Sequence, residues 1–151
     1  LDKKIKIRVL LAGEGPEKDK IKNFIIENNL QNKIKLMNFI KNPYPYLKMA
    51  DFFILTSNFE GLPNVLLEAQ TLKKIIISTN CPSGPKEILN NGMYGYLFKI
   101  GNHRDLTKKI LSAIKNKNLN KKMVKQGFQN LTRFDNVKNL EKYKKILSRY
   151  L

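Results

Sequence analysis

Two glutamates in residues 57–70, SNFEGLPNVLLEAQ, are the side chains best suited to hold a ligand. Glu60 lies beside a Gly-Leu-Pro turn, and Glu68 lies further along in an apolar run with helical spacing. A turn that opens a helix offers free backbone N–H groups and a helix dipole, both of which favour an anion. Carboxylates, by contrast, accept hydrogen bonds from hydroxyl groups. The pattern therefore favours a ligand with phosphates and hydroxyls, such as a nucleotide-sugar, and leaves ordinary surface charge open as the alternative.

Two other loops have compositions that suit a phosphate. The segment LLAGEGPEKDKI, residues 10–21, is a glycine turn that enters a helix, where backbone amides can approach an anion. It lacks the third glycine of a dinucleotide fingerprint and the Gly-Lys-Ser/Thr of a phosphate loop. The segment NCPSGPKEILNNG, residues 80–92, opens another helix at a proline and contains Ser83, Gly84 and Lys86. Each loop could equally be a structural turn.

Apolar runs that alternate with helical patterns predict the elements that position these loops. Strands with helices between them and short connections predict an α/β fold, with a Rossmann-like parallel sheet covered by helices on both faces. In such sheets ligands bind beyond the carboxyl ends of the strands. The strand at 51–57 is nearly all apolar and is expected to be covered on both faces. We expect one domain over 1–151, with strands at 5–13, 33–39, 51–57, 73–79 and 95–100 and helices after Pro16 and at 42–50, 63–72, 84–92 and 104–116.

Two boundaries in these helices are predicted from individual residues. The helix at 63–72 would begin with Pro63 at its first position or with Asn64 as its cap. The C-terminal region from about residue 104 reads as helical, with breaks near Gly127 and Phe134.

Composition restricts the classes of function. The formal net charge is +17, and residues 102–151 contain 14 Lys/Arg against 3 Asp/Glu. Such a basic balance attracts nucleic acid, anionic lipid head groups or a phosphorylated ligand, although a composition rich in Lys and Asn explains it as well. The basic C-terminal region is expected to be docked helix with a solvated cationic face, with a membrane-surface role second and nucleic acid third. A single cysteine, Cys81, and a single histidine, His103, in a polar turn, argue against a disulfide framework, a zinc site and a Ser-His-Asp hydrolase.

Four blocks in order resemble the C-terminal domain of family 4 retaining glycosyltransferases of the GT-B fold. The resemblance covers about residues 5–115, and its most specific part is the pattern S-x-x-E-G-x-P-x-x-x-x-E-A, which contains Glu60 and Glu68. The four blocks are LLAGEGPEKDKI, KIKLMNFIKN, ADFFILTSNFEGLPNVLLEA and STNCPSGPKEILNNGMYGYLF.

The resemblance implies a role for each matching residue. Glu60 would be the catalytic-site residue that holds hydroxyls of the donor sugar, and Glu68 would accept hydrogen bonds from the ribose hydroxyls. The other expected donor-site residues lie in loops at strand ends: Gly61, Leu62, Pro63, Asn64 and Val65 at the diphosphate or sugar, Phe39, Ile40 and Lys41 at the base, and Gly13 and Gly15 at the floor of the cleft.

The implied reaction is transfer of a hexose or N-acetylhexosamine from a UDP-sugar with retention of configuration. Galactose or N-acetylgalactosamine is the favoured sugar, and a polyprenyl-diphosphate-linked glycan is the favoured acceptor. The setting would be synthesis of bacterial O-antigen, lipopolysaccharide, capsule or another surface polysaccharide. Such enzymes would need no metal or other cofactor, and would work in the cytoplasm, peripherally on the inner face of the cytoplasmic membrane.

The sequence also departs from the family pattern. The opening strand of the domain, with a loop that carries an Arg and a Lys, has no counterpart here, and the N-terminal acceptor domain is absent. The chain is therefore expected to be the donor-binding half of an enzyme and to be inactive alone. Two other interpretations stay open: a non-catalytic nucleotide-binding module that acts with a partner chain, and a basic nucleic-acid-binding domain.

Overall fold

The chain folds as two compact units, one ending at Pro43 and the other beginning at Tyr44. The structure is a computed structural model that describes residues 5–150. Its strands form two sheets, one in each unit, and every strand pair is parallel. The predicted α/β class with a parallel sheet is therefore confirmed, while the prediction of a single domain over 1–151 stays a prediction.

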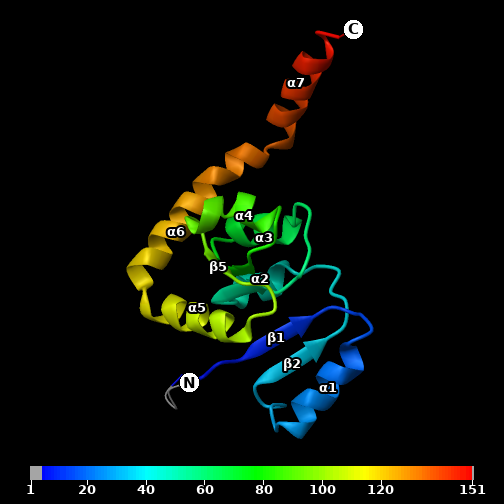
Figure 1. Cartoon of the computed structure of the whole chain (residues 1–151), viewed down its shortest axis with the longest axis vertical. Coiled ribbons are helices and arrows are strands. Elements are labelled where there is room, and N and C mark those ends of the chain that lie inside the picture. Colours follow the sequence, from blue (N-terminus) through cyan, green and yellow to red (C-terminus); the bar gives the residue numbers. More distant parts are fainter. Residues whose placement is uncertain (1–4, 151) are drawn as a thin grey trace. The chain divides into compact units, whose positions relative to one another are not determined.

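The first unit is one strand–helix–strand motif. It contains β1 (Val9–Ala12), α1 (Lys18–Glu27) and β2 (Ile34–Met37) (Figure 1). The two strands run in parallel, with Ala12 opposite Met37 at their carboxyl ends. The loops that follow both strands consequently begin at the same edge of this sheet.

The second unit contains a three-stranded parallel sheet in the order β3-β4-β5, with helices before, between and after the strands. Its elements are α2 (Tyr44–Met49), β3 (Phe52–Leu55), α3 (Asn64–Thr71), β4 (Ile75–Thr79), α4 (Pro85–Ile88), η1 (Asn90–Gly92), β5 (Tyr96–Phe98), α5 (His103–Lys115), α6 (Lys117–Asn130), η2 (Leu131–Phe134) and α7 (Asn136–Leu147).

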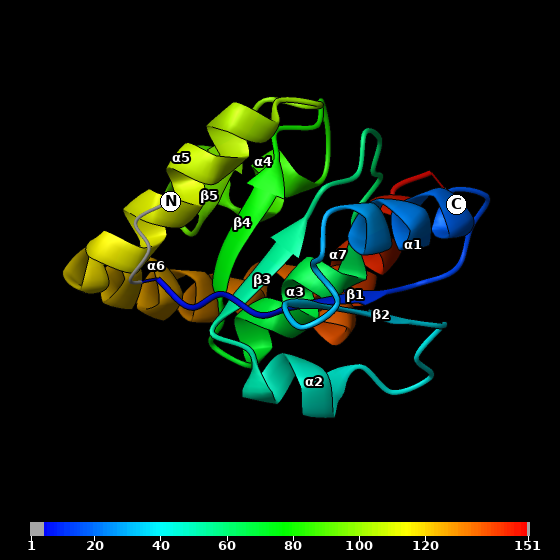
Figure 2. The same ribbon diagram turned by 90° about the horizontal axis from the view of Figure 1, so that it is seen from below.

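Helices cover both faces of the three-stranded sheet, as the sequence predicts. Successive residues of a strand point to opposite faces, and Ile76 and Ile77 of β4 show this directly. Ile76 packs with buried residues of α3 and α4, whereas Ile77 packs with Ala113 of α5 and Met123 of α6. Figure 2 shows α3 and α5 on opposite sides of β4. The central strand is thus buried from both sides, which explains its unbroken apolar run.

The strand at 51–57 is less covered than its apolar sequence predicts. β3 is half-buried along most of its length, and Ile54 is 37% exposed. The reason is its position, because β3 forms an edge of the three-stranded sheet and pairs with β4.

Helix α3 begins between its two predicted starts, one residue later than a first-position Pro63 and one residue earlier than an Asn64 cap would give. Pro63 takes the cap position with φ −71° and ψ 102°, which is extended backbone, and Asn64 is the first helical residue. The carbonyl of Pro63 accepts a hydrogen bond from the backbone N–H of Leu66 at 3.0 Å. The first-position proline and the asparagine cap are therefore both wrong by one residue.

The predicted helix break near Gly127 is wrong, whereas the break near Phe134 is confirmed. Helix α6 runs through Gly127 to Asn130. A Cβ atom at Gly127 would lie 3.0 Å from Nε2 of Gln70 on α3, so this glycine allows the two helices to approach closely. After η2 the backbone becomes extended at Asp135, whose side chain accepts a hydrogen bond from the N–H of Lys138 and caps α7.

Candidate functional site

The loop between β3 and α3 holds the two acids singled out by the sequence. Glu60 lies in the loop and Glu68 lies in the second turn of α3, and both are partly exposed. Within residues 5–150, neither carboxylate has a hydrogen-bond or ion-pair partner. Both acids are therefore available to a ligand and do not serve as partners in a structural ion pair.

The N-terminus of α3 provides an anion-favouring end beside Glu60. No side chain caps this helix, and its first turn contains no acidic residue. The helix is fixed on the sheet by Leu66 and Ala69, which are fully buried. Its first backbone N–H groups thus keep a defined position at the carboxyl end of β3, where they can donate to an anion.

The first unit carries the remaining predicted site residues at the carboxyl edge of its own sheet. Gly13 follows β1 with φ 148°, and a Cβ there or at Gly15 would have no atom within 4 Å. The segment of Phe39, Ile40 and Lys41 follows β2, and Phe39 is 73% exposed. The structure thus brings these five residues together at one strand edge, while Glu60, Glu68 and the residues 61–65 form a separate group in the second unit.

A surface hollow next to the Glu60 loop reveals a residue that sequence reasoning missed. It has a volume of about 440 Å³ and is lined by residues that include Ser83, Lys86 and Arg133. The guanidinium of Arg133, from η2, lies 3.7 Å from the carboxylate of Glu87. Arg133 lies some 50 residues after Ser83 in the sequence, and no sequence pattern indicates that the two are close in the structure. The hollow does not include Glu60 or Glu68, and its pairing of Arg133 with Glu87 makes it a poorer anion site than the end of α3.

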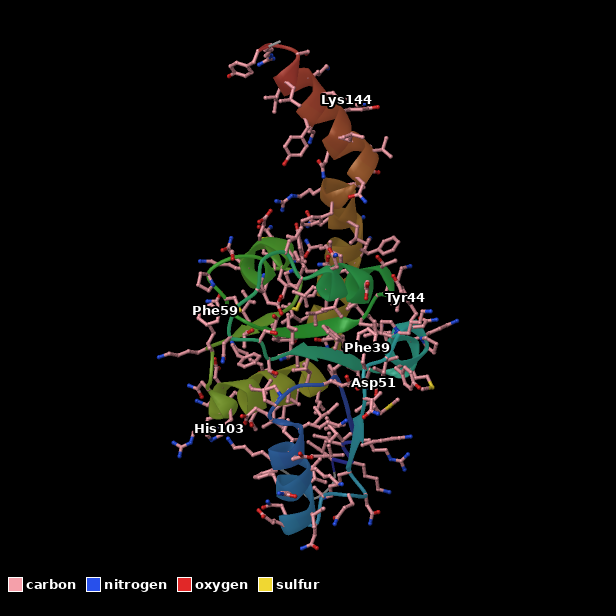
Figure 3. All side chains as sticks on the ribbon, turned by 90° about the vertical axis from the view of Figure 1, so that its right-hand side faces the viewer. Phe39, Tyr44, Asp51, Phe59, His103 and Lys144 are labelled. Atoms are coloured by element: carbon pink, nitrogen blue, oxygen red, sulfur yellow. The ribbon has the colours of Figure 1, made fainter. Side chains whose placement is uncertain are left out.

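Phe59 is a second neighbour of the site that the sequence did not mark. It directly precedes Glu60 and is 87% exposed (Figure 3). An apolar aromatic ring at this position offers a flat surface beside the carboxylate. The geometry of the loop leaves this ring exposed.

Other candidate chemistry is not assembled in the described part of the chain. No group of three His, Cys, Asp or Glu side chains that could hold a metal occurs among residues 5–150. His103 is exposed, as expected, but it is the first residue of α5 and not part of a loop (Figure 3). Cys81 is buried with a free thiol. In the same residues, no helix is long and apolar enough to cross a membrane.

Comparison with known proteins identifies relatives across nearly the whole chain. An N-acetylgalactosamine-N,N'-diacetylbacillosaminyl-diphospho-undecaprenol 4-alpha-N-acetylgalactosaminyltransferase of Campylobacter jejuni is 30% identical over 135 residues, which are 89% of this chain and 37% of that protein. The crystal structure of a glycosyltransferase from Rickettsia africae matches with a TM-score of 0.83 and 27% identity over 96% of this chain and 41% of that one. An S. aureus TarM variant, solved with fondaparinux, alpha-GlcNAc-glycerol and UDP, matches with a TM-score of 0.81 and 25% identity over 91% of this chain and 28% of that one.

The chain thus spans well under half the length of each of these relatives. The family model described as glycosyl transferases group 1 matches residues 1–130, and this range contains both glutamates and every strand of the two sheets. The chain belongs to the glycosyl transferases group 1 family.

Proposed function

We propose that this chain is the donor-binding half of a retaining glycosyltransferase and that it binds a UDP-sugar. The observation that carries the proposal is the pair of unpartnered carboxylates, Glu60 and Glu68, around the uncapped N-terminus of α3. Hydroxyl groups of a sugar would donate to the carboxylates, and the diphosphate would accept from the helix N-terminus. The S. aureus TarM variant, a relative with the same fold, was solved with UDP.

Each acid has its own part of the donor in this proposal. Glu68, fixed on α3, accepts hydrogen bonds from the ribose hydroxyls. Glu60, in the loop, holds hydroxyls of the transferred sugar at the reacting end. The backbone from Gly61 to Val65 meets the diphosphate, whose charge increases as the glycosidic bond breaks. Fixed N–H groups and a helix dipole aimed at that charge lower the barrier, because they need no reorganisation during the reaction.

Three further residues are proposed to border the base of the donor. Phe39, Ile40 and Lys41 border the uracil, and the exposed ring of Phe39 suits stacking on it. Gly13 and Gly15 form the floor of the cleft, where the space above each glycine leaves the backbone accessible to the ligand.

The transferred group is proposed to be a hexose or N-acetylhexosamine, with galactose or N-acetylgalactosamine favoured. The acceptor is proposed to be a polyprenyl-diphosphate-linked glycan of a bacterial surface polysaccharide such as O-antigen, lipopolysaccharide or capsule. The name of the Campylobacter jejuni relative supports both choices, since it describes an N-acetylgalactosaminyltransferase with a diphospho-undecaprenol substrate. The donor half alone is expected to bind and not to turn over.

No metal is proposed to take part, because the helix N-terminus and backbone amides can neutralise the leaving diphosphate. Donor affinity should therefore stay within about twofold when a chelator such as EDTA is added, a change of well under 1 kcal/mol. A loss of binding on chelation, restored by Mg²⁺ or Mn²⁺, would contradict this.

The protein is further proposed to work on the cytoplasmic face of the membrane, as a peripheral protein. The support is α7, whose residues at three- and four-residue spacing form two faces. Leu140, Tyr143 and Leu147 make an apolar stripe, each more than half exposed. The opposite face contains Lys138, Lys142 and Lys145. An amphipathic helix of this kind suits an anionic lipid surface.

Calorimetric titration of the chain with UDP and UDP-sugars tests the donor site. Wild type is expected to bind, and Glu68→Ala should lose about 1–3 kcal/mol as the ribose loses a charged hydrogen-bond partner. Glu141→Ala, which removes an exposed acid from α7, is the matched control and should bind as wild type does. Equal affinities of wild type and Glu68→Ala would refute the proposed role of Glu68, and absence of any binding would refute donor binding by this chain.

Sedimentation with lipid vesicles tests the membrane proposal separately. The chain should sediment with phosphatidylglycerol vesicles and stay in solution with phosphatidylcholine vesicles. A Leu140→Ser, Leu147→Ser double variant should lose this binding, whereas Leu119→Ser, an exposed leucine of α6, should keep it. Unchanged binding of the double variant would show that α7 is not the contact.

A further inference from the structure

The segment that follows β4 packs directly on the loop that carries Glu60. At the end of β4 itself, the hydroxyl of Thr79 donates a hydrogen bond to the carbonyl of Ser57 at 2.7 Å. The thiol of Cys81 lies 3.4 Å from the same carbonyl and 3.6 Å from the carbonyl of Asn58, which makes it a weak donor to both. Thr79 and Cys81 are almost completely buried. They therefore anchor the base of the Glu60 loop to the core of the sheet.

Ser83 extends this support to Glu60 itself. Its hydroxyl donates a hydrogen bond to the backbone carbonyl of Glu60 at 2.9 Å. Unlike Thr79 and Cys81, Ser83 is exposed, so water can satisfy the Glu60 carbonyl if the hydroxyl is removed. The bond thus restricts the backbone of one functional residue and contributes little to overall stability.

Gly84 completes the contact by its lack of a side chain. A Cβ atom there would overlap the carbonyl oxygen of Gly61 and lie 2.8 Å from Cδ of Pro63. Gly84 also has φ 70°, a left-handed conformation that strongly favours glycine. The backbone at Gly84 consequently lies directly against the backbone of Gly61 and the ring of Pro63.

We propose that the segment from Thr79 to Gly84 is the positioning element for Glu60, and that Ser83 is a positioning residue for the sugar end of the donor. This inference rests on the proposed function of the Glu60 loop. It implies that different parts of the chain position the residues at the two ends of the donor. Glu60 depends on the second loop, whereas Glu68 is fixed by α3 and its buried residues Leu66 and Ala69.

This difference predicts which part of the donor each change affects most. Without the Ser83 hydroxyl, the backbone at Glu60 samples more conformations, and binding of the sugar must restrict them again. The nucleotide end depends less on this bond, because Glu68 lies on α3 and the N-terminus of that helix offers the diphosphate further N–H groups besides that of Gly61. Ser83→Ala should therefore weaken binding of a UDP-sugar more than binding of UDP.

The test compares UDP with the best-bound donor among UDP-glucose, UDP-galactose and their N-acetyl forms, by calorimetric titration of the whole chain. Ser83→Ala should lose about two- to tenfold in affinity for the UDP-sugar, as expected for one hydrogen bond, and should lose clearly less affinity for UDP. Ser83→Thr retains the hydroxyl and should bind both UDP and the UDP-sugar as wild type does. Ser148→Ala removes another serine hydroxyl that donates to a backbone carbonyl, in this case that of Lys145, and should change neither affinity.

A melting curve for each variant separates positioning from stability. Ser83→Ala should melt within about 2 °C of wild type, since an exposed substitution has little effect on stability. Equal losses of UDP and UDP-sugar affinity, or no loss of either, would overturn the inference while the donor-site proposal stands. A wild-type chain that binds UDP-sugars no better than UDP would also overturn it. A wild-type chain that binds neither would instead refute the proposed function on which it rests.

Discussion

Strand β4 and helix α7 are the two extremes of this molecule. β4 has helices on both faces, and its residues Ile76 to Thr79 are no more than about 1% exposed. Helix α7 contains no buried residue, and it extends away from the three-stranded sheet in Figure 1. Both are regular elements of the second unit, yet one is held by packing and the other by its own hydrogen bonds.

The difference shows where this protein can hold a functional group in place. Isolated helices of about 12 residues are marginal in water, and α7 is supported by its internal bonds, its Asp135 cap and a hydrogen bond from the Asn139 amide to the carbonyl of Arg133. The end of β4, by contrast, is rigid enough to anchor a neighbouring loop. A site that needs a defined geometry is therefore expected beside β4, and a contact that can form and dissolve with a surface is expected on α7.

The largest effect on stability should come from a substitution that creates a cavity in the core at β4. Ile77→Ala should lower the free energy of unfolding by about 2–5 kcal/mol, because Ile77 is fully buried between β5, α5 and α6. Urea denaturation measures the change. Val137→Ala on α7 is the control and should shift stability by less than about 0.5 kcal/mol, as Val137 is 68% exposed. Similar costs for the two substitutions would remove the contrast between the regions.

A smaller effect is expected from Tyr96, which joins β5 to the C-terminal helices. Its hydroxyl donates to Oδ1 of Asn120 at 2.8 Å, and the amide of Asn120 donates to the carbonyl of Ala113 at 2.6 Å. Tyr96→Phe leaves the buried Oδ1 without its donor and should cost about 1–3 kcal/mol at neutral pH. The loss should appear in urea denaturation of the variant.

The same tyrosine makes stability depend on pH. Burial raises the pKa of Tyr96 from its ordinary value of 10.0. The folded state therefore favours the neutral phenol. The contribution of Tyr96 to the free energy of unfolding is complete below about pH 10, and it is lost as pH rises through the higher folded-state pKa. Between about pH 9 and pH 11, wild type should lose more stability than Tyr96→Phe. Tyr143→Phe on α7, where the ring is 66% exposed, should follow wild type.

The smallest effect on stability is expected on α7. Leu140→Ser should change the free energy of unfolding by less than about 0.5 kcal/mol, because Leu140 is 55% exposed and covers no core residue. Hydrogen exchange should find the α7 amides among the fastest in the second unit, apart from those of exposed loops. Slow exchange at α7, or a large cost for Leu140→Ser, would show that the helix is packed against other residues.

The sequence predicted the fold well where burial and turn chemistry agree. Apolar runs located every strand, and the alternation of strands with helices predicted parallel pairing. The misplaced break at Gly127 shows the limit of such reasoning, since a glycine that ends a helix and a glycine that admits a neighbouring helix look alike in one sequence. The edge position of β3 was equally hidden, because strand order is a property of the whole sheet.

The sequence predicted the residues of the candidate site but not the contacts that hold them in position. Glu60 and Glu68 stood out through spacing and through the family pattern. The hydrogen bond from Ser83 to the Glu60 carbonyl joins residues 23 positions apart, and no pattern in either segment announces it. Contacts to backbone carbonyls leave little trace in sequence, since any residue supplies the acceptor.

The edge position of β3 also affects how this chain behaves at high concentration. Among residues 5–150, β3 pairs with a strand on one side, that of β4, and a strand edge next to apolar side chains recruits strands from other molecules and leads to aggregation. A net charge of +17 opposes such encounters by repulsion between copies. Because salt screens that repulsion, the purified chain should stay dispersed at low ionic strength and precipitate as ionic strength rises.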